Sequence, residues 1–454
     1  MTVRLREALH EAADEVPGYL VYERALATAR RTRRRTAAAT AAVLVALAAM
    51  VWSVPVGQPG GQPGGMEPGS GSGALPDQIW KPPIGALRVT DPFPMGSAAL
   101  LFTGMRTMGS DEDGTVGAVG AEADRYRVLH VGYIKSAGHV VLLSPDGTRL
   151  AYPPEGDGTA PRVDIVDLTD GSVQQIPAVA AGSVSTQPLG WSPDGRGLVV
   201  IDSVRVDAER SSYRNVLSLV EPDTGTTVHL ASAPDTSSIV PGYAVAFAPD
   251  GQKLALQVDD TLTITDVAGT PRQTFRLPPD EILAGKGAWS PDSRAVTVAK
   301  RRGDAWTLAT IDPATGAPLG DLDVPAVSGV AAIRLLGWGP GGAALVVAYQ
   351  PTPEAARTTT KIEERILYPN VRTVRLLSLA PGAAAPITRM TAPIGVSAVD
   401  VADGLVRWGG TRVAEPPFVR LGPRFWFWLV VAVALGAAVL GGRWYVRRRE
   451  VSRR

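Results

Sequence analysis

The sequence predicts an all-β β-propeller, a closed ring of four-stranded sheets, flanked by two transmembrane helices. Three observations lead to this prediction. A short turn motif recurs at a spacing of about 50 residues, apolar β-rich runs follow its copies, and two long uncharged apolar segments lie near the ends of the 454-residue chain. The number of repeats predicts a seven-bladed propeller, with a six-bladed one as the alternative.

The repeated motif is a four-residue turn of the type Ser-Pro-Asp-Gly. Counted at its glycine or the equivalent residue, the copies stand 51, 48, 56, 42, 49 and 62 residues apart, and the first and last are degenerate. Apolar runs such as "LVVI" and "ALVVAY" follow, and several units then reach a second strand pair closed by an acidic turn. Four strands per unit at this period are typical of propeller blades. The positions counted are Gly96, Gly147, Gly195, Gly251, Ser293, Gly342 and Gly404.

Turn geometry alone accounts for each residue of the motif. Proline has the φ that the second position of a type I turn requires, a small polar residue suits the first position, and glycine suits the fourth. The alternative, a repeated calcium or sugar site like the aspartate boxes of sialidases, is disfavoured because their Ser-x-Asp-x-Gly-x-Thr-Trp spacing is missing. We therefore interpret as structural the residues Ser144, Pro145, Asp146, Gly147, Ser192, Pro193, Asp194, Gly195, Pro249, Asp250, Gly251, Pro291 and Asp292.

The aromatic-Ser-Pro-Asp-Gly turn with a following apolar strand, at 191–200 and 289–298, resembles the repeats of TolB-like and WD-repeat-like β-propellers. The resemblance covers roughly residues 84–413 and implies the fold. It implies little about function, because such propellers serve as binding platforms, assembly factors and enzyme appendages. The two-span frame with a short basic head is similar to actinomycete membrane proteins, some of which accompany alternative sigma factors. The zinc-binding His/Cys signature of many anti-sigma domains is absent.

Residues 37–56 and 425–442 are apolar runs long enough to cross the hydrocarbon core of a bilayer as helices. Arginine clusters precede the first and follow the second, so the positive-inside rule places both termini in the cytoplasm and residues 57–424 outside it. A cleaved signal peptide is the alternative for the first run. The predicted order is a basic helical head (1–36), a transmembrane helix (37–56), a Gly/Pro-rich tether (57–83), the propeller (84–413), a short linker (414–424), a transmembrane helix (425–442) and a basic tail (443–454).

Composition excludes several classes of function. The chain has no cysteine, which rules out disulfides, thiolate metal sites and a cysteine nucleophile. The chain contains 45 basic and 44 acidic residues, and removal of the two termini (14 basic, 6 acidic) leaves 31 basic and 38 acidic residues between the spans. This net charge of −7 argues against nucleic acid as a partner, since binding it requires a basic face.

Binding residues are predicted on one face of the propeller. If the repeated turn joins the innermost strand of a blade to the second, the connections between second and third strands lie on the opposite face, and this is where the insertions fall: 104–125, 153–161, 202–213 and 350–366. Lengthened loops on one face are where binding residues collect, although tolerated surface decoration is the alternative. The candidate binding residues are Asp111, Glu112, Asp113, Lys300, Arg301, Arg302, Asp304, Arg357, Lys361 and Arg365.

No catalytic, metal or cofactor site is predicted. His130, His139 and His229 have no metal-ligand spacing, "DEDGTVG" lacks the later glutamate of an EF-hand, and no G-x-S-x-G motif occurs. The predicted function is a non-catalytic binding, sensing or assembly platform for a protein or a small extracellular ligand. The alternatives are a hydrolase- or lactonase-like enzyme that uses the bore, and a membrane regulator of a cytoplasmic partner such as a sigma factor. An enzyme is expected to show converging His, Asp, Glu or Arg side chains at the bore mouth.

Overall fold

The computed structural model describes residues 73–451 apart from nine short gaps, and the predicted head, first span and most of the tether lie outside the described residues. The chain divides into two compact units. Residues 65–425 belong to one unit, and the residues from 426 onward belong to the other. The gaps are residue 84 and residues 92–93, 105–113, 133–135, 156–159, 208–211, 359–361, 367–368 and 418–421.

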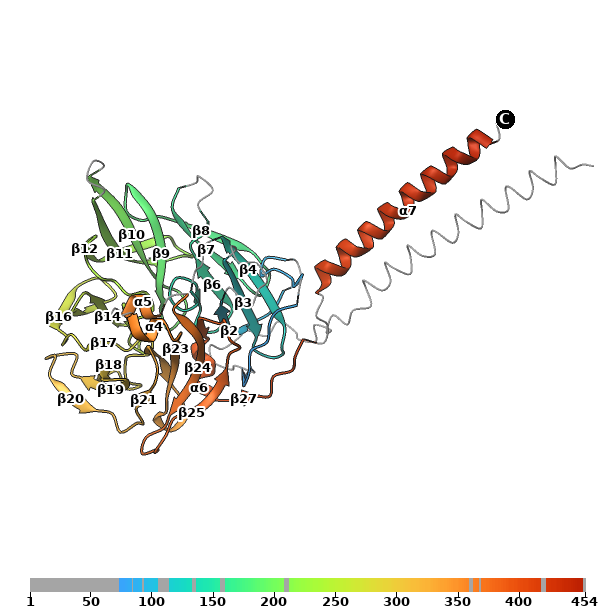
Figure 1. Cartoon of the computed structure of the whole chain (residues 1–454). Helices are drawn as coiled ribbons and strands as arrows, with labels where there is room; N and C mark the ends of the chain where they lie inside the picture. Colours follow the sequence, from blue (N-terminus) through green and yellow to red (C-terminus); the bar gives the residue numbers. More distant parts are fainter. Residues whose placement is uncertain are drawn as a thin grey trace, which may run out of the picture. The chain divides into compact units, whose positions relative to one another are not determined.

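The larger unit is a β-propeller with six blades (Figure 1). Blade one consists of β26 (Ala398–Val401), β2 (Ala98–Thr103), β3 (Gly114–Gly120) and β4 (Tyr126–Gly132). Blade two consists of β5 (Leu142–Leu143), β6 (Arg149–Tyr152), β7 (Arg162–Asp167) and β8 (Val173–Pro177). Blade three consists of β9 (Ser183–Trp191), β10 (Leu198–Asp207), β11 (Ser212–Glu221) and β12 (Thr226–Pro234).

The remaining blades have the same antiparallel order. Blade four consists of β13 (Val245–Phe247), β14 (Lys253–Val258), β15 (Thr261–Asp266) and β16 (Pro271–Arg276). Blade five consists of β17 (Glu281–Leu283), β18 (Val296–Arg302), β19 (Ala305–Ile311) and β20 (Pro318–Asp321), and β21 (Val327–Ser328) also pairs with β19. Blade six consists of β22 (Ala332–Trp338), β23 (Ala344–Pro351), β24 (Val371–Leu379) and β25 (Ile387–Thr391).

The predicted count of seven blades is wrong, and the closure of the ring explains the error. Blade one takes its innermost strand, β26, from the far end of the chain, where it pairs with β2 from the near end. The turn that joins first and second strands elsewhere is therefore split here into two pieces, one before β2 at Gly96 and one after β26 at Gly404. Both degenerate copies belong to the same blade, so seven copies make six blades.

Burial falls from the centre of the ring to its rim. All six residues of β2 and all three of β13 are buried, whereas β20 is fully exposed and β16 is almost so. Blades pack face to face, so a central strand is covered on both sides and its sequence is a continuous apolar run rather than an alternating one. This packing explains why runs such as "LVVI" follow the turns.

The two ends of the ring differ, and we name them by their connections. The turn face carries the connections between first and second strands and between third and fourth strands. The loop face carries those between second and third strands and between blades. On the loop face the connection between β23 and β24 is long and contains the short helices α4 (Ala355–Thr358) and α5 (Ile362–Arg365), and β10 and β11 form a hairpin of ten-residue strands.

The two ends of the propeller chain are tied together. β1 (Leu75–Pro76) pairs in parallel with β27 (Thr411–Arg412), and the Arg412 guanidinium lies 2.6 Å from the Asp124 carboxylate. Further along, Arg424 forms a two-pronged ion pair with Asp91, at 3.0 and 2.5 Å. Ion pairs thus join Arg412 and Arg424, near the end of this unit, to residues near its beginning.

α7 (Pro423–Val451) is the one helix among the described residues that is long and apolar enough to cross a membrane. Its apolar part, Pro423–Trp444, has 22 residues, which corresponds to roughly 33 Å of helix and matches a bilayer core. The second predicted span, 425–442, lies within it. The first predicted span, 37–56, lies outside the described residues.

Candidate functional site

The polar atoms of the Ser-Pro-Asp-Gly turns are satisfied within the turns themselves. In 192–195 the Ser192 hydroxyl donates to Asp194 at 2.6 Å and accepts from the Gly197 N–H at 2.7 Å, while the Asp194 carboxylate accepts from the Arg196 N–H at 3.0 Å. The fourth residue has a positive φ in each full copy, 70° at Gly195, and the Ser293 that replaces it elsewhere adopts 58°. The geometry therefore accounts for the recurring residues of the turn without a ligand.

Replacement of Asp194 by alanine tests this interpretation. The variant loses the hydrogen bonds that the carboxylate makes to Ser192 and to the Arg196 N–H, so we expect a loss of about 1 kcal/mol in the free energy of unfolding. Urea unfolding of the full chain measures it. Since the turn has no ligand role in this interpretation, added calcium should not change the unfolding midpoint of the wild type, and a calcium-dependent shift abolished by the substitution would contradict the structural interpretation.

Two of the tryptophans that precede the turn, Trp289 and Trp338, join neighbouring blades, a role that the sequence pattern did not predict. The Trp289 indole N–H donates to the Ala246 carbonyl of the preceding blade at 3.0 Å. The Trp338 indole N–H donates to the carbonyls of Gly287 and Trp289, at 3.0 and 2.8 Å. Each tryptophan thus joins the innermost part of its own blade to that of the blade before it.

A cluster of charged side chains crosses the bore. The Lys286 ammonium lies 3.0 Å from Asp400 and 2.7 Å from Asp403, and it donates to the Val401 carbonyl at 2.6 Å. The other Asp400 carboxylate oxygen accepts from the Leu143 N–H at 3.0 Å. Asp400 is 2% exposed, whereas Lys286 and Asp403 reach solvent with 21% and 33% of their side chains. The carboxylate of the ring-closing strand therefore contacts blades two and five.

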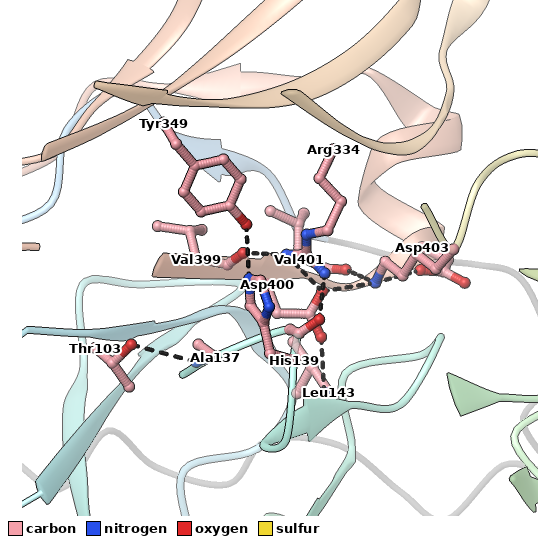
Figure 2. A network of polar contacts seen from close by, with 12 residues as sticks. Thr103, Ala137, His139, Leu143, Arg334, Tyr349, Val399, Asp400, Val401 and Asp403 are labelled. Carbon is pink, nitrogen blue, oxygen red and sulfur yellow. Dashed lines mark hydrogen bonds and ion pairs between the residues drawn. The ribbon is translucent and has the colours of Figure 1, made fainter. Parts of the chain in front are cut away.

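Arg334 closes the bore from the side of blade six. It is 1% exposed, and its guanidinium donates to the carbonyls of Gly138 and Val399 and lies 4.0 Å from Asp400 (Figure 2). Beside it the His139 ring pairs with the Tyr349 hydroxyl at 2.9 Å (Figure 2). Tyr243 packs edge-on against the same ring. This buried group fills the centre of the propeller toward the loop face.

A small cavity remains on the turn side of this plug. It offers about 50 Å³ to water-sized groups within a depression of about 540 Å³, and residues of every blade contribute to its walls. The polar part of the lining consists of Lys286, Arg334, Asp400 and Asp403. The apolar part consists of Leu142, Leu143, Leu189, Trp191, Pro193, Val245 and Phe247.

The charges of the cluster stabilise one another. Burial alone would lower the pKa of Lys286, but Asp400 and Asp403 outweigh it and the pKa is raised. Burial alone would raise the pKa of Asp400, but Lys286 and Arg334 outweigh it and the pKa is lowered. Both pKa values move away from neutrality, so these groups stay charged at neutral pH. Among the described residues no group of three or more metal-ligating side chains occurs.

Those predicted binding residues that the structure describes lie at connections of the loop face, and two of them form ion pairs with neighbouring carboxylates. Lys300 and Arg302, at the end of β18, form ion pairs with Glu281 and Asp321 at 2.5 and 2.6 Å, and Asp304 follows in the same hairpin. Arg301, beside them, lies near enough to Arg365 of α5 to help lower its pKa, after burial. Arg357 lies in α4 and is exposed. Asp111, Glu112, Asp113 and Lys361 lie outside the described residues.

The bore cluster was missed by the sequence analysis, although one signal for it existed. Asp400 and Arg334 are single charged residues within otherwise apolar innermost strands, in "AVDV" and "AIRLLGW". A charge in such a strand has to be paired inside the ring, because burying it alone is costly. What the sequence does not reveal is the partner, since Lys286 is more than 100 residues from Asp400 along the chain.

No family model matches the chain, and no curated protein matches it. It is similar to solved structures of TolB from Acinetobacter baumannii (15% identity, 68% of this chain and 66% of that one, TM-score 0.36) and of a putative TolB from Agrobacterium tumefaciens (16%, 66% and 91%, 0.38). It is also similar to an oligogalacturonate lyase from Vibrio parahaemolyticus (11%, 67% and 81%, 0.39). At these values the similarities support no statement about activity. The assignment to the six-bladed β-propellers rests on the strand order.

Proposed function

We propose that this protein is a membrane-anchored, extracytoplasmic β-propeller that acts as a non-catalytic binding platform, with a protein partner on its loop face. The observation that carries the proposal is the mutual neutralisation of the charged groups in the bore. A general acid or base works best when its pKa lies near the operating pH. The pKa of Lys286 is raised and the pKa of Asp400 is lowered, so both pKa values move away from neutral pH.

The competing proposal of an enzyme in the bore has one point in its favour, because charged side chains do converge there. Their contacts argue against it. Lys286 and Asp400 are engaged with each other and with neighbouring backbone groups, Arg334 donates to two carbonyls, and the single cavity at this site is small. Paired charges that bridge blades are well suited to holding the ring closed.

The loop face is the more suitable surface for a protein partner. It carries the connection between β23 and β24, with α4 and α5, and the extended hairpin of β10 and β11. Arg301 and Arg365 bring positive charge from blades five and six near each other, which suits an acidic surface of a partner. Binding residues collect on loops that a rigid scaffold positions.

The membrane part of the proposal is supported by the length of α7 and by the arginine clusters of the sequence. With both termini in the cytoplasm, the propeller faces the outside. Since the chain has no cysteine, one introduced cysteine reports on one position alone. We expect Arg357→Cys, on the loop face, to react with a membrane-impermeant maleimide in intact cells and, when it carries a photocrosslinker, to capture a partner.

Arg196→Cys is the matched control on the turn face, because Arg196 is also an exposed arginine. Arg196→Cys should react with the maleimide equally well. When it carries the photocrosslinker, it should yield at least about tenfold less of the crosslinked partner than Arg357→Cys does. If Arg357→Cys reacts only after lysis, the proposed location is wrong. If the two positions capture the same partner equally, the assignment of binding to the loop face is wrong.

A further inference from the structure

The two most exposed large apolar side chains of the propeller unit lie on one short segment. Val413 is 80% exposed and Trp408 is 66% exposed, and every other large apolar side chain among the described residues of this unit is less exposed. The segment follows the ring-closing strand and leads to α7. Single exposed apolar residues are normal on a protein surface, but a tryptophan and an aliphatic residue next to a proposed span are typical of a membrane–water interface.

This segment is fastened to the turn side of blade one. The Arg412 guanidinium lies 2.6 Å from the Asp124 carboxylate and donates to the Gly120 carbonyl at 3.1 Å, and the Glu415 N–H also donates to Asp124, at 2.6 Å. Asp124 belongs to the connection between β3 and β4, which lies on the turn face. Val413, next to Arg412 in the chain, therefore stands beside this connection.

The first turn of α7 is fixed to the outer edge of the same blade. Residues 87–89, just before the blade, hydrogen-bond to β4 as an additional edge. The Arg424 N–H donates to the Gly85 carbonyl at 3.2 Å, and its guanidinium forms the two-pronged ion pair with Asp91. Arg424 lies in α7 and still belongs to the propeller unit. Since the apolar stretch of α7 begins at Pro423, this edge is held where the proposed span begins.

Two arginines of this edge have guanidiniums that can meet an anion. Arg88 and Arg125 are exposed, and within the described part of the chain neither guanidinium has a hydrogen bond or an ion pair. Arginine binds phosphate in a two-pronged geometry. The exposed carboxylates of Glu122 and Glu415 lie close to Arg125 and Val413 in the chain, so the surface is not strongly basic. It therefore suits phosphates that are accompanied by a cationic group, as in zwitterionic phospholipids.

The surface is also hollowed beside Arg125. A depression between blades one and two offers about 230 Å³ to water-sized groups, and its walls include Arg125, Ser97 and Thr169. This is several times the roughly 30 Å³ that one water molecule occupies, so a headgroup has room there.

We propose that this corner of the propeller, defined by Arg88, Arg125, Trp408 and Val413, rests on the phospholipid headgroup layer of the membrane that α7 enters. The two guanidiniums bind lipid phosphates, and the two apolar side chains insert between headgroups. The inference rests on the membrane anchoring by α7 proposed above. It orients the platform, because the turn side of blade one then faces the bilayer and the loop face, at the other end of the blades, stays open to a partner.

The test uses single labelled cysteines in the full, otherwise cysteine-free chain, reconstituted in phosphatidylcholine nanodiscs. A fluorophore on Val413→Cys should be quenched by lipids that carry a nitroxide on the headgroup. Ile394→Cys is the matched control, an aliphatic residue that is 61% exposed in the connection between blades six and one, on the loop face. The two faces are separated by the length of β4, seven residues, or roughly 23 Å. We therefore expect at least about tenfold stronger quenching at Val413 than at Ile394.

Val433→Cys, within the apolar part of α7, separates this inference from the proposed anchoring. Its label should be quenched by a nitroxide deep in the acyl chains. Deep quenching at Val433 together with equal headgroup quenching at Val413 and Ile394 would overturn the inference and leave the anchoring intact. An absence of deep quenching at Val433 would contradict the anchoring itself.

The role of the ion pair is tested by charge reversal. Arg424→Glu opposes two carboxylates, so headgroup quenching of the label at Val413 should fall at least about threefold. Adding Asp91→Arg restores opposite charges and should recover the quenching. Arg302→Glu, which disrupts the exposed ion pair with Asp321, is the control and should change nothing. Unchanged quenching in Arg424→Glu would show that the ion pair does not hold this corner at the membrane.

The role of the two guanidiniums is tested by combining Arg88→Gln with Arg125→Gln. Loss of both phosphate contacts should lower the quenching at Val413 at least about threefold. The matched control combines Arg196→Gln with Arg294→Gln, two exposed arginines in turns of blades three and five. An equal effect of the two combinations would refute the binding of phosphates by Arg88 and Arg125.

Discussion

Asp400→Ala is expected to destabilise the propeller by about 3–5 kcal/mol, the range measured when one partner of a buried ion pair is removed. The substitution removes the carboxylate that faces the buried Arg334 guanidinium and one of the two carboxylates beside Lys286. It also removes the acceptor of the Leu143 N–H. Asp400 lies on β26, the strand that closes the ring. Loss of its contacts therefore weakens the ring at its closure. Urea unfolding of the full chain, followed by tryptophan fluorescence, measures the change.

Asp403→Ala is the matched control for this prediction. Asp403 contacts the same Lys286 ammonium, but a third of its side chain is exposed, so its removal should cost about 1 kcal/mol or less. Asp400→Asn keeps an acceptor for Leu143 and removes the charge, and its stability should fall between the two. Equal destabilisation by Asp400→Ala and Asp403→Ala would show that the buried ion pair does not hold the ring closed.

The second large effect concerns pH. Burial, and after it the positive charge of Arg334, lowers the pKa of His139 from 6.5 to about 3. Between these two values the unfolded chain binds a proton at this residue and the folded chain does not. The free energy of unfolding should therefore fall as the pH falls below about 6.5, by about 1.4 kcal/mol for each pH unit. Above about pH 6.5 His139 is neutral in both the folded and the unfolded chain, so the stability that acid removes is fully present there.

Urea unfolding at a series of pH values between about 7.5 and 4.5 measures this slope. His139→Gln cannot take up the proton, and its amide can still pair with the Tyr349 hydroxyl, so the variant should be less sensitive to acid over this window by the same amount. The lowered pKa of Asp400 acts in the same direction but only at lower pH, where that carboxylate begins to be protonated. An unchanged slope in His139→Gln would contradict the assignment of the acid sensitivity to this residue.

The long apolar helix α7 and the repeated turns show what local sequence can predict. The apolar run at 425–442 falls within α7 because the length of an uncharged segment and its helical rise are local properties. Ser192 to Gly195 form the predicted turn because proline, a short polar side chain and glycine each satisfy a local backbone requirement. Neither prediction depends on a distant part of the chain.

The number of blades could not be predicted in the same way. The copies at Gly96 and Gly404 are each recognisable as half of a turn, but whether they form one blade or two depends on whether β26 pairs with β2. Such closure joins the two ends of the propeller chain. It is favoured because it removes two exposed sheet edges, an effect that no local window contains.

The sequence by itself thus determined the propeller class, its repeated turns and the apolar helix near its end, because periodicity and hydropathy act over short stretches of chain. Only the tertiary structure decided that there are six blades, that Asp400, Lys286 and Arg334 meet in the bore, and that Trp289 and Trp338 join neighbouring blades. Each of these facts depends on residues that lie far apart in the chain and are brought together from different blades. Their energies come from burial and pairing of charges, which exist only once the ring has closed.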